Sequence, residues 1–60
     1  MSSTVFYLEQ ERTVCEYVDD SEMVFVFSVE TSRYETLESA QQAAFNLAVD
    51  ASNTYKYIYR

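Results

Sequence analysis

Glycine and proline are both absent from the sixty residues of this chain, and their absence limits its chemistry as well as its turns. Phosphate-binding loops, dinucleotide-binding turns and the strained turn that carries a hydrolase nucleophile all require glycine, so the sequence excludes them. Histidine is absent as well, which removes the commonest general base and the usual activator of a serine or cysteine nucleophile. We therefore expect a protein that is not an enzyme.

The chain is long enough for one small domain, which we place at residues 1–60. Folding buries apolar surface worth about 90 kcal/mol, and ordering the chain costs about the same, so an isolated copy should be only marginally stable. The single cysteine, Cys15, cannot form an intramolecular disulfide or, without histidine, a zinc site. We expect it to be a small, buried, reduced side chain. We expect no metal and no cofactor, and association or good packing must supply the remaining stability.

The charge is strongly acidic and unevenly distributed. Four basic and ten acidic side chains give a net charge of −6, and residues 1–38 hold nine acidic and two basic groups, a net −7. Nucleic acid and anionic membranes should repel such a chain, so we expect neither as a direct partner. The longest apolar run, residues 23–27, is too short to span a membrane, and no secretory signal follows Met1. These features predict a cytoplasmic protein.

Three segments in the first half of the chain have the composition of β-strands, at residues 4–9, 12–18 and 23–30. The Asp-Asp-Ser-Glu sequence at 19–22 predicts a turn, because Asp and Ser side chains bond to nearby backbone groups. Gln10 and Glu11 are poor residues for a two-residue hairpin, which favours Gly or Asn at positive φ. Residues 4–18 therefore form either two strands or one long bent strand.

The periodicity changes at Thr36, which is a suitable N-cap for a helix. Small and apolar residues then recur at helical spacing as far as Ser52-Asn53, where we expect the helix to end. The predicted apolar stripe comprises Leu37, Ala40, Ala44, Leu47, Ala48 and Ala51.

The last segment, residues 54–60, alternates aromatic and other side chains and predicts a final strand. Tyr55, Tyr57 and Tyr59 would then share one face of that strand. The element order predicts an α+β fold, with an antiparallel or mixed sheet of three or four strands and one helix packed on one face.

Six carboxylates fall within fourteen residues and form the first candidate for binding a partner. On a strand, Glu9 and Glu11 would lie about 6.8 Å apart on one face, twice the axial rise per phosphate of a DNA strand, so they could mimic a phosphate row. The other interpretation is a solvated edge whose charge provides solubility and opposes aggregation. The six residues are Glu9, Glu11, Glu16, Asp19, Asp20 and Glu22.

Exposed apolar surface is the second candidate for binding a partner. The predicted strand at 23–30 is apolar on both faces, whereas one short helix covers only one. A partner protein, a second copy of this chain or the folded-over N-terminal residues could cover the other. The tyrosines at 55, 57 and 59 are either an interface, for which tyrosine is well suited, or ordinary cross-strand packing.

The order of these predicted elements is an acidic turn, an apolar strand, a helix opened by the segment TSRYETLESAQQAA and a closing strand. This order resembles small phage-encoded host-takeover proteins, in particular the podovirus inhibitors of bacterial RNA polymerase. The likeness covers residues 12–60 in pattern, and in detail only Glu35-Thr36-Leu37 and the alanines that follow. It implies a protein that binds and blocks a host enzyme, and no individual functional residue carries over.

The residues and the resemblance together predict a small acidic protein-binding module of the phage-inhibitor type. It would block a basic surface of a host protein, including surfaces that bind nucleic acid. The alternative is a homodimeric structural or regulatory module with no inhibitory role.

Overall fold

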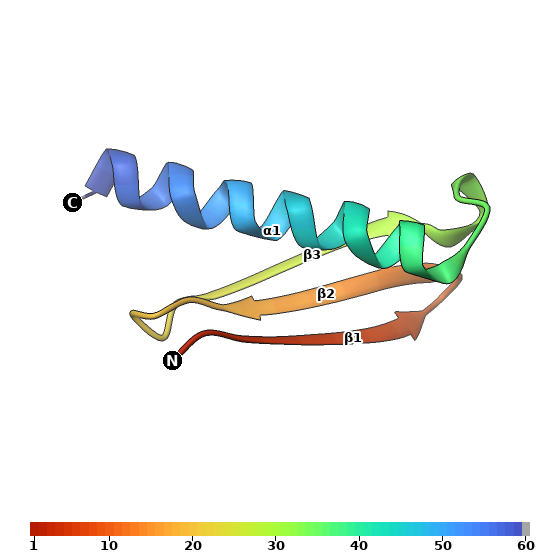
Figure 1. The fold of residues 1–60 in the computed structure, drawn as a ribbon, viewed down its shortest axis with the longest axis horizontal. Helices are drawn as coiled ribbons and strands as arrows, with labels where there is room; N and C mark the ends of the chain where they lie inside the picture. The colour runs from red at the N-terminus through yellow and green to blue at the C-terminus, as the bar shows by residue number, and fades with distance from the viewer. Residues whose placement is uncertain (60) are drawn as a thin grey trace.

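The computed structural model describes residues 1–59, and side chains as far as Ile58, as three strands followed by one long helix (Figure 1). The strands β1 (Ser3–Glu9), β2 (Arg12–Val18) and β3 (Val24–Glu30) form an antiparallel sheet in the order β1-β2-β3. A short 3₁₀ helix, η1 (Thr31–Arg33), leads to α1 (Leu37–Tyr59), which packs on one face of the sheet. The predicted α+β class is confirmed, with three strands and one helix.

The first turn resolves the alternative left open at residues 4–18 in favour of two strands. Glu9 pairs with Arg12, so Gln10 and Glu11 alone make the turn, with φ of 51° and 64°. Positive φ at both central residues is the pattern of a type I′ hairpin turn, whose twist matches that of the strands it joins. The seven-residue pairing of β1 with β2 therefore outweighs the unfavourable turn residues.

The second turn, at residues 19–22, is confirmed and is built around one aspartate. The backbone N–H groups of Ser21 and Met23 donate to Asp19 Oδ1 at 2.8 Å and 3.0 Å. The N–H of Glu22 donates to the Asp19 carbonyl at 3.0 Å, and Glu22 itself has a φ of 64°. One carboxylate thus provides the local bonding that lets a chain without glycine reverse direction here.

The helix begins as predicted and continues further than predicted. Thr36 is the N-cap, because its Oγ1 accepts the Ser39 N–H at 3.1 Å. The final strand expected at 54–60 is not formed: α1 runs through Ser52 and Asn53 to Tyr59, and Arg60 lies outside the described residues. No glycine or proline interrupts the helix, and adding residues to an existing helix is easier than starting a new element, which explains the difference.

Small side chains dominate the contact between helix and sheet. Ala40, Ala44, Ala48 and Ser52 are almost fully buried, at spacings of four residues along α1. Leu37 and Leu47, which were expected in this stripe, are instead 44% and 45% exposed. On the sheet Cys15 is fully buried against Ala44 and Ala48, and larger, partly buried side chains surround it, namely Tyr17, Phe25, Phe27, Val29 and Phe45.

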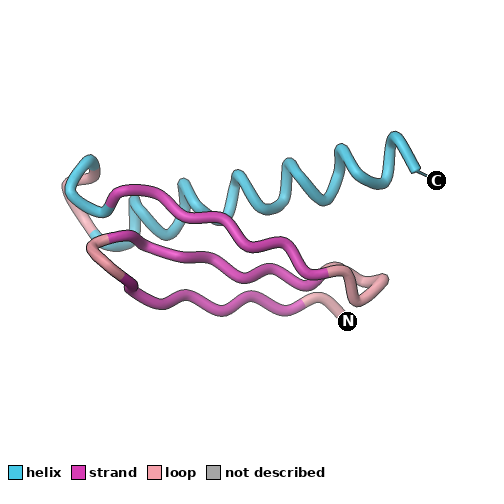
Figure 2. The backbone as a smooth tube through the Cα atoms, turned by 180° about the vertical axis from the view of Figure 1, so that it is seen from behind, coloured by secondary structure: helices cyan, strands magenta, loops and turns pink. Residues whose placement is uncertain are grey.

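The helix covers only part of the sheet. It packs on β2 and β3, while β1 lies farthest from it in both views (Figures 1 and 2). All seven residues of β1 are exposed. Because β1 is itself a strand of the sheet, the N-terminal residues do not fold over the second sheet face, and that interpretation of the apolar strand is wrong.

Candidate interaction surfaces

The sheet face turned away from α1 is a partly apolar surface that the described elements leave uncovered. Side chains alternate between the two faces of a strand, and Cys15, Phe25 and Phe27 face the helix. Their sequence neighbours therefore form the opposite face, which we call the open face. Its central side chains are Val5, Tyr7, Val14, Glu16, Val18, Val24 and Val26.

A carboxylate lies in the middle of the open face. Glu16 pairs in register with Val5 on β1 and with Val26 on β3, which are 54% and 52% exposed. The Tyr7 hydroxyl donates a hydrogen bond of 2.7 Å to Glu16 Oε2. This bond, followed by burial and the charges of Glu16 and Glu9, raises the pKa of Tyr7 above its ordinary value.

Two polar residues of the open face, Arg12 and Ser28, bond to each other beside Val14. Arg12 Nε donates to Ser28 Oγ at 2.9 Å, and its Nη2 donates to the Ser28 carbonyl at 3.3 Å. Val14, in register with both Tyr7 and Ser28, is only 6% exposed as a result of these neighbours. The exposed apolar area is therefore concentrated around Glu16, toward the end of the sheet that carries Val24.

The six acidic residues proposed as one cluster do not lie together. Glu9 and Glu11 are at one end of the sheet, close to Arg12, whereas Asp20 and Glu22 are in the turn at the other end, about 20 Å away along the strands. Glu11 is in a turn, not on a strand, so the row of two evenly spaced carboxylates does not exist. The prediction of phosphate mimicry by this pair is wrong.

Asp19 is excluded as a partner contact because the fold uses it. It is 1% exposed, and Ser52 Oγ on α1 donates to its Oδ2 at 3.3 Å, in addition to the two backbone bonds in its own turn. Burial opposes its ionisation, but the bonds from Met23, Ser21 and Ser52 and the charge of Lys56 outweigh it and lower the pKa of Asp19. This residue anchors the end of the helix to the turn.

The expected ladder of tyrosines is replaced by separate positions on a helix. Residues two apart on an α-helix point about 200° away from each other, so Tyr55 and Tyr57 face opposite ways. Tyr55 packs edge-on against Phe25, with ring centroids 6.2 Å apart, whereas Tyr57 is 78% exposed. The side chain of Tyr59 lies outside the described residues. Tyr57 is therefore the more exposed of the two described side chains, since Tyr55 is 39% exposed.

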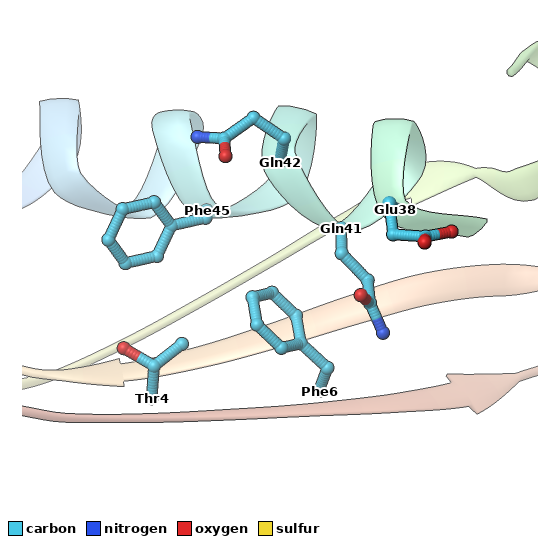
Figure 3. Close-up of a pocket in the computed structure, with 6 residues that line it drawn as sticks. All are labelled: Thr4, Phe6, Glu38, Gln41, Gln42 and Phe45. Atoms are coloured by element: carbon cyan, nitrogen blue, oxygen red, sulfur yellow. The ribbon is translucent and has the colours of Figure 1, made fainter. Parts of the chain in front are cut away.

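An apolar groove runs between β1 and α1 and was not predicted. Phe6 and Thr4 point from β1 toward the helix, and Phe45 and Gln41 extend from the helix toward the sheet (Figure 3). The groove has a volume of about 380 Å³, and Glu38 and Gln42 complete its wall. It exists because a helix is only about as wide as two strands, so that the third strand is left uncovered.

Cys15 matches its prediction as a small buried side chain, because it is fully buried and makes no disulfide. Burial, followed by the charge of Glu16, raises the pKa of its thiol, which makes it a poor nucleophile at neutral pH. Within residues 1–59, no three side chains of the metal-binding types come close enough to hold an ion. No helix in that part of the chain is long and apolar enough to cross a membrane.

Part of the open face can be predicted from the alternation of the sequence. Alternation in the third strand assigned Val24 and Val26 to the second face, whereas Val5 was not singled out and Glu16 was grouped with the other acids. The pairing register was the missing information, because it alone brings Val5, Glu16 and Val26 side by side.

Comparison with known proteins adds no relative: no family model, no curated protein and no solved structure matches the chain.

Proposed function

We propose that this protein is a small acidic binding module whose open face binds a basic surface of another protein and blocks it, as phage-encoded inhibitors of host enzymes do. The observation that supports this function best is the Glu16 carboxylate surrounded by exposed valines in the middle of an uncovered sheet face. No match to a known protein carries the proposal, which rests on the resemblance of the sequence and on this surface.

The arrangement around Glu16 suits a partner that inserts an arginine or lysine among apolar side chains. Val5 and Val26 flank the carboxylate, and the Tyr7 hydroxyl fixes it by donating to Oε2. A partner covering the valines would exclude water, and a charged pair is stronger where water is excluded. An arginine fits best, because its guanidinium makes two parallel bonds to a carboxylate.

Long-range charge favours the same kind of partner. The net charge of −6 would attract a basic surface and accelerate association, mainly at low ionic strength. Asp20, Glu22, Glu9 and Glu11 contribute to this attraction from the two ends of the sheet without contacting the centre of the interface. The proposal places the protein in the cytoplasm, where a lone reduced cysteine is stable.

The test compares three immobilised proteins as baits in a bacterial lysate: wild type, Glu16→Arg and Asp50→Arg. The two variants change the net charge equally, but Asp50 is exposed on α1, away from the open face. We expect basic proteins to be retained by wild type and by Asp50→Arg and to be lost with Glu16→Arg. Far-ultraviolet circular dichroism verifies that both variants are folded.

The captured protein is then used in purified form. Its association rate should fall as salt is raised from about 50 to 500 mM, and its own activity should decrease in proportion to the bound fraction. Equal retention by all three baits would disprove binding through Glu16. Binding that leaves the captured protein fully active would disprove inhibition.

A further inference from the structure

We infer that two copies of this chain pair through the outer edge of β3 and the adjacent flank of α1, giving a six-stranded sheet with two helices packed side by side. The inference does not rest on the proposed function, because it concerns a different surface from the centre of the open face. Four independent features of the fold lead to it.

The first feature is the thin core. The largest side chains that are fully buried are Thr13, Asp19, Cys15 and Ser52, so no large apolar side chain among the described residues is completely removed from water. Large apolar side chains on α1 remain exposed instead, with Leu47 at 45% and Ile58 at 60%. A chain of this size with so little apolar burial is expected to gain stability by association.

The second feature is the position of α1 relative to the two sheet edges. The helix packs on β2 and β3, so its axis lies above the line midway between these two strands. Measured across the sheet, the axis is about half a strand spacing from β3 and about one and a half spacings from β1. Pairing two copies through β3 would place the helix axes about 10 Å apart, and pairing through β1 about 19 Å apart. Packed helices lie about 8–10 Å apart. Only pairing through the β3 edge therefore allows the two sheets to join and the two helices to pack against each other at the same time.

The third feature is the chemistry of the two flanks of the helix. The flank toward β1 carries Glu38, Gln41 and Gln42 around Phe45, and these residues line the groove beside Phe6. At 100° per residue, Leu47 lies about 180° from Glu38 and therefore faces the β3 side. Small or apolar residues recur on this β3 flank at spacings of four, four, three and four, typical of a helix-packing seam, and the exposed Asp50 lies at the margin of the seam. The seam residues are Ala43, Leu47, Ala51, Thr54 and Ile58.

The fourth feature is that one two-fold axis fits both layers. Phe27 is in register with Cys15, which packs against Ala44 and Ala48, so the middle of β3 lies level with Leu47 on the helix. An axis through Phe27 pairs it with Phe27 of the second copy and also brings Leu47 against Leu47 of the second copy. A second copy is therefore an occupant that can satisfy the strand edge and the helix flank with a single symmetry axis.

The distribution of charge is compatible with this register, and it disfavours a dimer formed through the two open faces. With the axis at Phe27, Glu30 lies opposite Val24 of the second copy. Glu30 is the only charged side chain of β3, so no like charges meet across the paired strands. A two-fold axis through the centre of the open face would instead bring Glu16 against Glu16 of the second copy. Pairing through β3 leaves that face uncovered, and both open faces then lie on the same side of the six-stranded sheet.

The test is the oligomeric state by sedimentation over about 1–200 μM, for wild type, Leu47→Glu and Leu37→Glu. Leu37 is as exposed as Leu47 but lies outside the seam, so it is the matched control. We expect wild type and Leu37→Glu to form dimers, and Leu47→Glu to weaken the dimer at least 100-fold because two carboxylates meet on the axis. Circular dichroism verifies folding, and Leu47→Cys provides a second readout if Leu47→Glu is unfolded.

Leu47→Cys should form a disulfide-linked dimer under mild oxidation, whereas Leu8→Cys on the exposed β1 edge should not. A wild-type monomer at 200 μM, a dimer that is insensitive to Leu47→Glu, or crosslinking through Leu8→Cys in place of Leu47→Cys would each overturn the inference. These outcomes are independent of capture through Glu16, so the two proposals fail separately.

Discussion

The two ends of the sheet reverse the chain in different ways. At the Gln10 end, two residues turn β1 into β2 with positive φ at both Gln10 and Glu11. At the Asp19 end, the five residues 19–23 turn β2 into β3 around a buried carboxylate that accepts hydrogen bonds from two backbone N–H groups and the Ser52 hydroxyl. Both turns place non-glycine residues at positive φ, two in the first turn and Glu22 in the second, but the second turn is also held by the side-chain hydrogen bonds of Asp19.

The comparison shows how a chain without glycine distributes stability between its turns. Each non-glycine residue at positive φ costs roughly 1 kcal/mol, and the Gln10 end recovers this only through the pairing of β1 with β2. The Asp19 end also holds α1, because Ser52 lies on the buried stripe of the helix. Damage at the Asp19 end should therefore affect the whole fold, whereas the Gln10 end should tolerate and even benefit from change.

The largest effect is expected for Asp19→Ala. The change leaves the N–H groups of Ser21 and Met23 and the Ser52 hydroxyl without their acceptor, and it releases the helix from the turn. We expect Tm to fall by about 10 °C or more, measured by circular dichroism. Asp20→Ala, next to it but exposed, is the control and should change Tm by less than about 3 °C. Equal effects of the two changes would show that the Asp19 network does not stabilise the fold.

Lowering the pH should reduce the stability of the fold through the same residue, Asp19, by less than Asp19→Ala does. The pKa of Asp19 is lower in the fold than its ordinary value of 3.8, so its ionised form favours folding. This contribution is complete above about pH 4 and is lost as the pH falls through the lowered pKa. The Tm difference between wild type and Asp19→Asn should therefore shrink as the pH falls from 6 to 2. A difference that is constant with pH would contradict the direction of this pKa.

The smallest effect, and the only gain, is expected at the Gln10 end. Glu11→Gly removes the cost of positive φ at the second turn residue and should raise stability by about 0.5–1 kcal/mol in urea unfolding. Asp20→Gly, at a position without positive φ, is the control and should instead lower stability through the added freedom of the unfolded chain. A loss of stability with Glu11→Gly would show that its side chain contributes more than its backbone costs.

Most of the fold could be predicted from the sequence because strand periodicity is local. The β2 bounds and the N-cap at Thr36 were predicted at the observed residues, since both depend on side chains within a few positions. The end of the helix was missed because TYKYIY alternates like a strand, whereas tertiary contacts decide the matter: Ser52 bonds to Asp19 and Tyr55 packs on Phe25.

The candidate surfaces were harder to predict because they depend on pairing between distant residues. The acidic residues looked like one cluster along the chain, yet the hairpins send Glu9 and Glu22 to opposite ends of the sheet. Burial of Asp19 depends on a helix residue 33 positions later, which no local pattern indicates. The open face was predicted only in part, because it needs the register that brings β1 and β3 to either side of Glu16.

The order of elements has a consequence for the protein during its synthesis. All strand pairings join neighbours along the chain, so the sheet can be complete once β3 has been made, but α1 lies entirely in the residues that follow. At about 5–20 residues per second, the ribosome needs about 1.5–6 s to add residues 31–59. Until α1 has been made and has packed on β2 and β3, the sheet lacks a cover on both faces, so its final stability can be reached only after synthesis of the helix.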